Sequence, residues 1–149
     1  MKIRKFRKQD AKKVSNMIRK TLMEVNIRDS PRFAVEELYG EYSPKELVKL
    51  SKEREIYLVI EKDKIIGTGG LENNYICTVF VHPDYRGKGI GKIIMDYLEN
   101  KIKSKKYSFA ELNSGPTALT FYKKLGYKKI KETFVKGKKT SILMRKRIK

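Results

Sequence analysis

The apolar residues in the first part of the chain follow strand-like and helical spacings in turn. Residues 2–7 carry Ile3 and Phe6 in a strand-like pattern. Asp10 then precedes a stretch in which an apolar residue recurs every three or four positions, at Ala11, Val14, Ile18, Leu22 and Val25. This spacing predicts an amphipathic helix, capped by Asp10, that packs one face on a sheet.

A second helix is predicted to begin after Ser43. Ser43-Pro44-Lys45-Glu46 supplies a capping serine, a proline in the first turn and a glutamate three residues after the cap. We expect this helix to run to about Arg54. Residues 28–42 lack a regular period and contain Pro31, so we expect a loop there with a short helical piece at 34–38.

Three short apolar runs follow, at Ile56–Ile60, Ile65–Leu71 and Tyr75–Val81. Their length and residue types predict strands, and the turn at Asp63-Lys64 joins the first two as a hairpin. The second run also contains three glycines, which predict a bulge or a close approach of another element: Gly67, Gly69 and Gly70.

The remaining apolar positions predict two more helices and three more strands. These are a helix from Ile90 to the basic stretch 101–106, a strand at Tyr107–Leu112, a short helix from Pro116 to Gly126, and a hairpin of Tyr127–Val135 with Ser141–Ile148. The strands before and after the first of these helices should be parallel, because a crossover joins them. We therefore expect one α/β domain over residues 1–149, with a mixed and mostly antiparallel sheet.

The composition is typical of a soluble protein. The chain has 149 residues, 40% of them hydrophobic, and its apolar runs are too short to cross a bilayer. It opens with the charged segment Met1–Lys5 rather than with a signal-peptide pattern. Its single cysteine, Cys77, cannot form an internal disulfide. We expect a cytoplasmic protein, monomeric or homodimeric, with no membrane partner and no metal site.

The charge raises nucleic acid as a partner. There are 36 Lys and Arg residues against 17 Asp and Glu, a formal net charge of +19. Such an excess attracts polyanions. The basic residues are nevertheless spread through the chain, with dense stretches only at 101–106, 128–139 and 145–149. A solvated basic surface is favoured, and a basic nucleic-acid or ribosome-associated module stays open as an alternative.

One segment combines a strand end, a turn, a basic glycine-rich loop and a helix start. It runs from Val79 through His82-Pro83-Asp84 to Lys92, with glycines at 87, 89 and 91. Glycines let successive backbone N–H groups turn toward one point, and a helix N-terminus adds its positive dipole. This arrangement predicts an anion at Gly87 to Lys92.

Two other glycine motifs fail at this segment. A dinucleotide-binding fingerprint that begins at Gly87 and Gly89 needs a third glycine where Lys92 stands. A Walker A loop needs a glycine at Arg86 and a Ser or Thr at Ile93.

With Arg86-x-x-Gly89-x-Gly91 after its strand, the chain resembles the GNAT superfamily of N-acetyltransferases. Val81 to Gly91 follows that family's main acetyl-CoA motif, and 112–127 follows its second motif, from Leu112-Asn113-Ser114-Gly115-Pro116 to Leu125-Gly126-Tyr127. The element order is similar over essentially the whole chain. The resemblance implies a six- or seven-stranded sheet with about four flanking helices and a central parallel strand pair splayed apart for acetyl-CoA.

The resemblance also implies how acetyl-CoA would be bound as cosubstrate. The pantetheine arm would pair with the strand before the loop, and the pyrophosphate would lie on the loop amides, with Arg86 and Lys92 adding charge. Asn113 would take a cofactor role from a position shifted relative to most members. The residues expected at the cofactor are Val79, Phe80, Val81, Arg86, Gly87, Lys88, Gly89, Ile90, Gly91, Lys92, Asn113 and Tyr122.

In the family, an amine attacks the thioester directly, so Cys77 needs no role as a nucleophile. A tyrosine at the place of Tyr122 protonates the departing thiolate, and we expect Tyr122 to act as general acid. The base stays open between Glu72 and Glu111, or the proton passes to water. His82 is expected to lie beside the loop without a catalytic role.

The acceptor is also open among a protein N-terminus, a lysine side chain and a small amine. An acyl-CoA binder without turnover is a further alternative.

Overall fold

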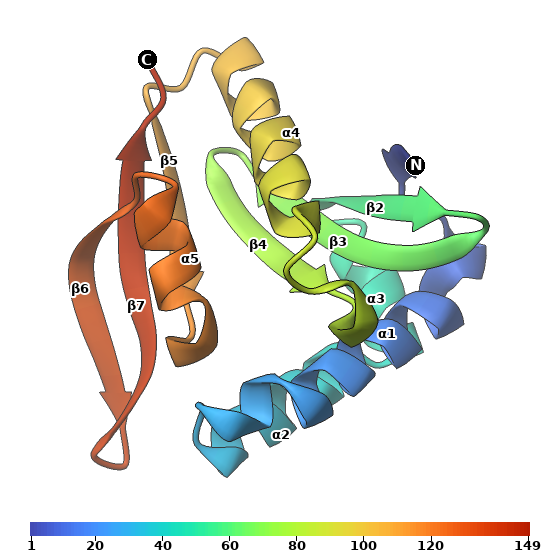
Figure 1. Ribbon diagram of the computed structural model, residues 1–149, viewed down its shortest axis with the longest axis horizontal. Coiled ribbons are helices and arrows are strands. Elements are labelled where there is room, and N and C mark those ends of the chain that lie inside the picture. The colour runs from blue at the N-terminus through green and yellow to red at the C-terminus, as the bar shows by residue number, and fades with distance from the viewer.

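A seven-stranded sheet runs through the molecule in the order β1-β2-β3-β4-β5-β7-β6. The computed structural model describes residues 1–149 (Figure 1). The strands are β1 (Lys2–Lys5), β2 (Glu55–Glu61), β3 (Lys64–Glu72), β4 (Tyr75–Val81), β5 (Phe109–Ser114), β6 (Lys128–Val135) and β7 (Lys138–Arg147). Only β4 and β5 pair in parallel, so the predicted mixed sheet with one parallel pair is confirmed.

Five α-helices cover the two faces of this sheet. They are α1 (Ala11–Glu24), α2 (Arg32–Glu41), α3 (Pro44–Leu50), α4 (Ile90–Ser104) and α5 (Leu119–Lys124). The apolar stripe of α1 packs with α2, α3 and one face of β2 and β3, and Ile18 and Leu22 there are fully buried. α4 and α5 pack on the opposite face, around Met95 and Leu98. No helix of the chain combines the length and the apolarity that a membrane span needs.

The expected loop over residues 28–42 is wrong in extent. A ten-residue helix, α2, occupies Arg32–Glu41, and Pro31 stands at its N-cap rather than interrupting it. Proline is tolerated at a helix start because the first N–H groups have no partner within the helix. Val35 anchors this helix, with only 1% of its surface exposed.

Other boundaries differ by a few residues. α3 ends at Leu50 rather than near Arg54, and β5 begins at Phe109 and ends at Ser114. The last hairpin turns on Lys136-Gly137 alone. The Asp10 carboxylate does not cap α1. It accepts a hydrogen bond from the backbone N–H of Arg7 instead.

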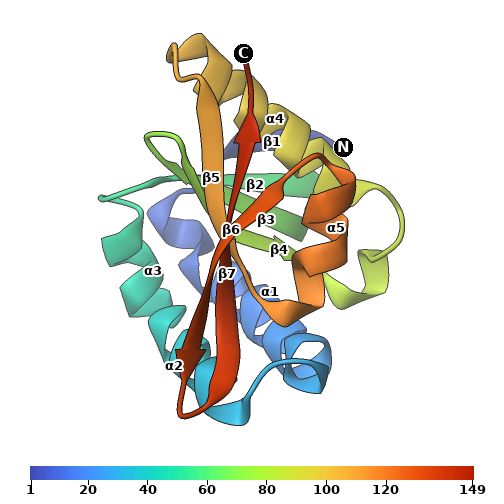
Figure 2. The same ribbon diagram turned by 90° about the vertical axis from the view of Figure 1, so that its left-hand side faces the viewer.

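The central parallel pair is short and then opens. β4 and β5 pair only at Tyr75–Glu111 and Ile76–Leu112. Beyond these residues β5, β7 and β6 turn away as a second half of the sheet, which crosses in front of β2, β3 and β4 in Figure 2. The edge of β4 that faces β5 therefore has no partner strand from Cys77 to Val81, as the splayed pair of the family resemblance implied.

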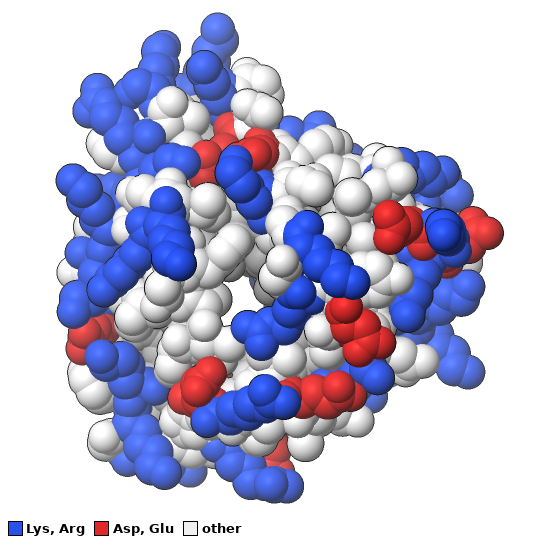
Figure 3. Space-filling view, viewed as in Figure 1, with Lys and Arg blue, Asp and Glu red and all other residues white.

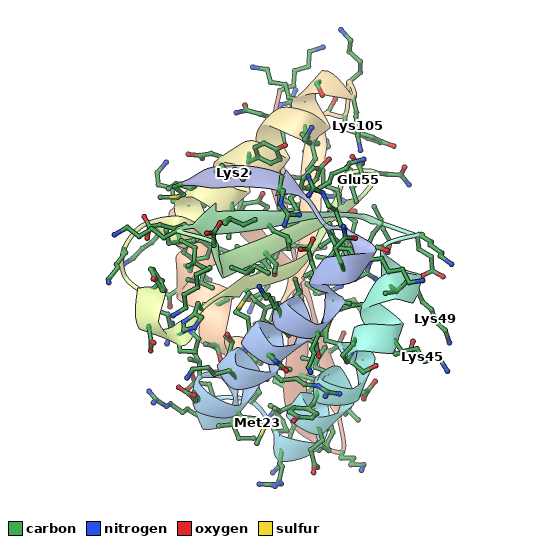
Figure 4. The ribbon with its side chains drawn as sticks, turned by 90° about the vertical axis from the view of Figure 1, so that its right-hand side faces the viewer. Lys2, Met23, Lys45, Lys49, Glu55 and Lys105 are labelled. Carbon is green, nitrogen blue, oxygen red and sulfur yellow. The ribbon has the colours of Figure 1, made fainter.

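An ion pair ties the far end of α4 to the first half of the sheet. Lys105, just after α4, pairs with Glu55 at the start of β2, and Figure 4 shows the two side chains close together. The hydroxyl of Tyr57 also donates to Glu55 Oε1, at 2.6 Å. α4 is thus tied to β2 at its C-terminal end, while its N-terminal end is left free to border a ligand site.

The glycines of β3 allow α4 to approach the sheet closely. A Cβ at Gly69 would lie 2.6 Å from Ile94 Cγ2 and 3.0 Å from Leu98 Cδ1. A Gly69→Ala variant should therefore lose about 1–3 kcal/mol of unfolding free energy through overpacking. Gly40→Ala, in α2 with open space around its Cβ, should gain about 0.5–1 kcal/mol from helix propensity. Urea titrations of both variants measure their free energies of unfolding. Equal changes in the two variants would contradict the close approach of α4 to β3.

A nearly buried ion pair joins β1 to the start of α1. Arg4 holds both oxygens of Asp10, at 2.8 and 2.9 Å, and this contact lowers the pKa of Asp10 below its ordinary value. A carboxyl whose folded pKa is depressed stabilises the fold above its unfolded pKa of about 4 and loses that contribution as the pH falls further. Acid unfolding followed by circular dichroism should begin at higher pH in an Asp10→Asn variant than in the wild type.

Candidate active site

A cleft of about 430 Å³ opens where β4 ends and α4 begins. It is bordered by Val79–Val81 of β4, by Arg86, Gly87 and Gly89 of the loop with the first turn of α4, by the end of α1, and by α5. Figure 3 shows a hollow in the middle of this face, walled mostly by uncharged side chains and with Lys and Arg at its rim.

The loop presents its backbone N–H groups to this cleft. None of the amides from Gly87 to Lys92 donates a hydrogen bond within the chain. Gly87 and Gly89 have φ angles of +74° and +83°, which favour glycine, and Gly89 is the N-cap of α4. Free amides at a helix N-terminus form an anion site. This geometry agrees with the anion predicted from the sequence.

β4 carries a bulge beside the cleft, at Thr78. Its φ of +54° is unusual for a β-branched residue, so the surrounding structure must hold it. The Thr78 hydroxyl accepts from Arg54 Nη1 at 3.1 Å and lies 3.2 Å from the Tyr42 hydroxyl. Its carbonyl accepts from Thr68 Oγ1 at 2.6 Å. These contacts fix the backbone within the open edge of β4.

A second cavity, of about 510 Å³, lies on the other side of this bulge. α2, β4, the end of β5 and the β6–β7 hairpin contribute to its walls. It shares five lining residues with the first cleft: Asn26, Val79, Phe80, Ala118 and Tyr122. Two ligands could therefore meet at β4, each entering from its own side.

Tyr122 borders both cavities, and 6% of its surface is exposed. Burial is the main cause that raises its pKa above the ordinary value, so the phenol keeps its proton at neutral pH. Its ring packs edge-on against Phe121 and Tyr127. The hydroxyl has no hydrogen-bond partner within the chain and is available to a ligand.

One further atom indicates that the cleft accepts a polar ligand. The Oγ1 of Thr117, whose residue lines the cleft, is a buried polar side-chain atom without a hydrogen-bond partner. Buried hydroxyls are rarely left unpaired. The free amides, the unpaired Thr117 hydroxyl, and the nearby Arg86 and Lys92 fit the phosphates and polar groups of acetyl-CoA.

Comparison with known proteins agrees with this geometry. Residues 28–148 match the family model described as an acetyltransferase (GNAT) domain. The chain belongs to the GNAT acetyltransferase family. The resemblance inferred from its two motifs is therefore confirmed.

The relatives of this GNAT chain either have low sequence identity to it or match it over only part of their own length. It is 37% identical over 55 residues to an uncharacterized N-acetyltransferase, ycf52, of Porphyra purpurea, a stretch of 37% of this chain and 32% of that protein. It therefore matches about a third of the length of that relative. The peptidyl-lysine N-acetyltransferase YjaB of Salmonella typhimurium is 25% identical over 85% of this chain and 82% of its own.

Solved structures share the GNAT fold at low identity. A GCN5-related N-acetyltransferase from Rhodopseudomonas palustris superposes with a TM-score of 0.89 at 18% identity, over 98% of this chain and 94% of its own. The PaiA N-acetyltransferase of Thermoplasma acidophilum, solved in complex with coenzyme A, superposes with a TM-score of 0.81 at 20% identity. The superposition covers 98% of this chain and 98% of that one.

Most of the residues expected at the cofactor lie together in this GNAT cleft. Lys88 and Asn113 do not line it. The Lys88 ammonium lies 5.2 Å from the centre of the Tyr85 ring, and Asn113 lines the second cavity, where it donates to the Tyr75 hydroxyl at 2.8 Å. The residues that do line the cleft are Val79, Phe80, Val81, Arg86, Gly87, Gly89, Ile90, Gly91, Lys92 and Tyr122.

Neither predicted base borders either cavity. Glu72 accepts a hydrogen bond from Arg54 Nε at 3.0 Å, and Glu111 is held by Arg145 at 2.6 Å. His82 lies beside the loop as expected. Its Nδ1 accepts from the backbone N–H of Asp84 and its pKa is lowered, first by burial, so it is neutral near pH 7.

Several residues that line the two cavities are not indicated by either motif. Thr21 reaches the first cleft from α1, and its hydroxyl lies 3.3 Å from the Val81 carbonyl. In the sequence, the only indication of this role is that Thr21 is a polar residue within the apolar stripe of α1. Glu37 and Glu41 reach the second cavity from α2, of which the sequence pattern predicts only a short piece at 34–38.

Proposed function

We propose that this protein is an acetyl-CoA-dependent N-acetyltransferase in which an amine attacks the thioester directly. The observation that carries the proposal is the meeting of two cavities at Val79, Phe80 and Tyr122. One cavity offers free amides to phosphates, and the other leaves room for an acceptor. Acetyl-CoA would supply the activated acetyl group.

In this proposal, groups of the chain itself bind acetyl-CoA and orient its thioester. The amides from Gly87 to Lys92 hold the pyrophosphate, and Arg86 and Lys92 add positive charge. The open edge of β4 pairs with the pantetheine arm as an added strand would. A backbone N–H on this edge polarises the thioester carbonyl in a place that the Thr78 contacts hold rigid.

Proton movements complete the reaction. The amine nitrogen forms a bond to the acetyl carbon as the carbon–sulfur bond breaks. Tyr122 gives its proton to the leaving sulfur, because its raised pKa keeps it protonated until then. The amine's own proton leaves to solvent through the second cavity, since Glu72 and Glu111 are held outside it by arginines.

Release of the CoA thiol in the presence of acetyl-CoA and a panel of amines and lysine peptides tests the proposal. Release that depends on an added acceptor is the expected result. Tight acetyl-CoA binding without release from any acceptor would instead indicate a binding protein. Salt-dependent RNA binding without acetyl-CoA binding would favour the nucleic-acid alternative.

A further inference from the structure

The second cavity differs in charge from the rest of the chain. Lys and Arg account for 36 of the 149 residues and are spread over the face drawn in Figure 3. The cavity, by contrast, has no lysine in its walls, and Arg54 is its single arginine. The Lys136 ammonium is outside the lining but lies 4.9 Å from the centre of the Phe33 ring, which lines the cavity.

Two carboxylates line the same cavity from α2. Glu37 and Glu41 are four residues apart, with Phe33 one turn before them, so all three share one side of the helix. Neither glutamate has an ion-pair partner in the chain. Desolvation raises the pKa of Glu41, partly opposed by Arg54 and reinforced by Glu37. Like charges at this spacing are unfavourable, and a bound cation would relieve them.

Arg54 lines the cavity but opposes the rise in the pKa of Glu41 only in part. Its Nε donates to Glu72 at 3.0 Å and its Nη1 donates to Thr78 at 3.1 Å, and 14% of its side chain is exposed. Its guanidinium is thus held by Glu72, which does not line the cavity, and by Thr78 of the β4 bulge. Glu37 and Glu41 remain available to a ligand.

The walls toward the reacting end are mainly apolar. Leu38 and Phe33 of α2 face the cavity together with Phe80 and Val79 of β4. The Tyr42 ring meets Phe80 edge-on, with ring centres 5.3 Å apart. An aliphatic chain could pass along these walls, between the glutamates and the place where the two cavities meet.

We propose that the acceptor is a small aliphatic diamine or polyamine. One ammonium pairs with Glu37 and Glu41, while the second amine, uncharged, reaches Val79 and Tyr122 and is acetylated. The new carbon–nitrogen bond replaces the carbon–sulfur bond of acetyl-CoA. The amine proton passes to water and the thiolate receives a proton from Tyr122. This rests on the proposed function, because it names the acceptor of that same site.

Putrescine and butylamine are the matched probes, since they share a four-carbon chain and differ by one ammonium. We expect kcat/KM for putrescine to exceed that for butylamine about tenfold, mostly through KM. The double variant Glu37→Gln/Glu41→Gln should lose that preference, with kcat/KM for putrescine lowered about tenfold relative to that for butylamine. Glu36→Gln is the control: it removes the same charge from α2 at an exposed residue that pairs with Arg32 outside the cavity.

Calorimetric binding of both amines to the protein–CoA complex separates this inference from the proposed function. Glu37- and Glu41-dependent binding of putrescine without turnover would support the diamine site while contradicting the enzyme. Equal binding and equal turnover of the two amines would overturn the diamine site. So would a lysine peptide with a higher kcat/KM than any diamine.

Discussion

A Tyr122→Phe variant should lose about 100-fold in kcat while its affinity for acetyl-CoA stays within about twofold. The substitution removes one oxygen and keeps the ring that packs on Phe121 and Tyr127. The hydroxyl makes no hydrogen bond within the chain, so its loss should cost little stability. Its expected role appears only when the thiolate leaves, and an interaction of that kind affects kcat rather than substrate binding.

Steady-state kinetics over a range of pH measure this effect. Tyr97→Phe is the matched control, since Tyr97 packs against Tyr57 and lines neither cavity. Full turnover by Tyr122→Phe across that range would remove the general-acid role and leave Tyr122 as a packing residue.

A Gly91→Val variant should raise the KM for acetyl-CoA about 100-fold, and overpacking against Phe121 should also lower its melting temperature. A Cβ at Gly91 would lie 2.9 Å from Phe121 Cζ, so α5 would be pushed away from the first turn of α4. Both elements border the cleft, and the loop amides would no longer converge on one phosphate. Losing one charge-assisted hydrogen bond, worth about 1.5–3 kcal/mol, accounts for an effect of this size.

Gly40→Val serves as the control, because its Cβ would have open space on the surface of α2. It should leave the KM for acetyl-CoA unchanged. An unchanged KM in Gly91→Val as well would mean that the pyrophosphate does not depend on the approach of α4 to α5.

The parts of the site that the sequence predicted are those that a short segment determines by itself. Glycines at 87 and 89 and a helix start at Ile90 are enough to bring amides together, whatever packs around them. The second motif likewise places Tyr122 on its own short helix. In both segments, the residue types alone determine the local backbone geometry that the site needs.

The acceptor side depends on contacts between distant residues, which no local pattern shows. α2 was underestimated because Pro31 was interpreted as a break, although proline also favours a helix start. The pairing of Glu72 with Arg54 and of Glu111 with Arg145 joins residues 18 and 34 positions apart. Carboxylates that look free in the sequence are therefore held by arginines in the fold.

The bulge at Thr78 shifts the phase of β4. In a regular strand Ile76 and Phe80 would face the same side, because side chains alternate. Here Ile76 packs in the α4 core with Val79 and Val81, while Phe80 packs in the α1 core. A regular strand of the same length, without the bulge, would turn Phe80 into the α4 core, whereas removing the extra residue would restore the alternation and leave Phe80 on the α1 side. The bulge therefore lets β4 hold one extra residue while Phe80 stays on the α1 side, where it borders both cavities.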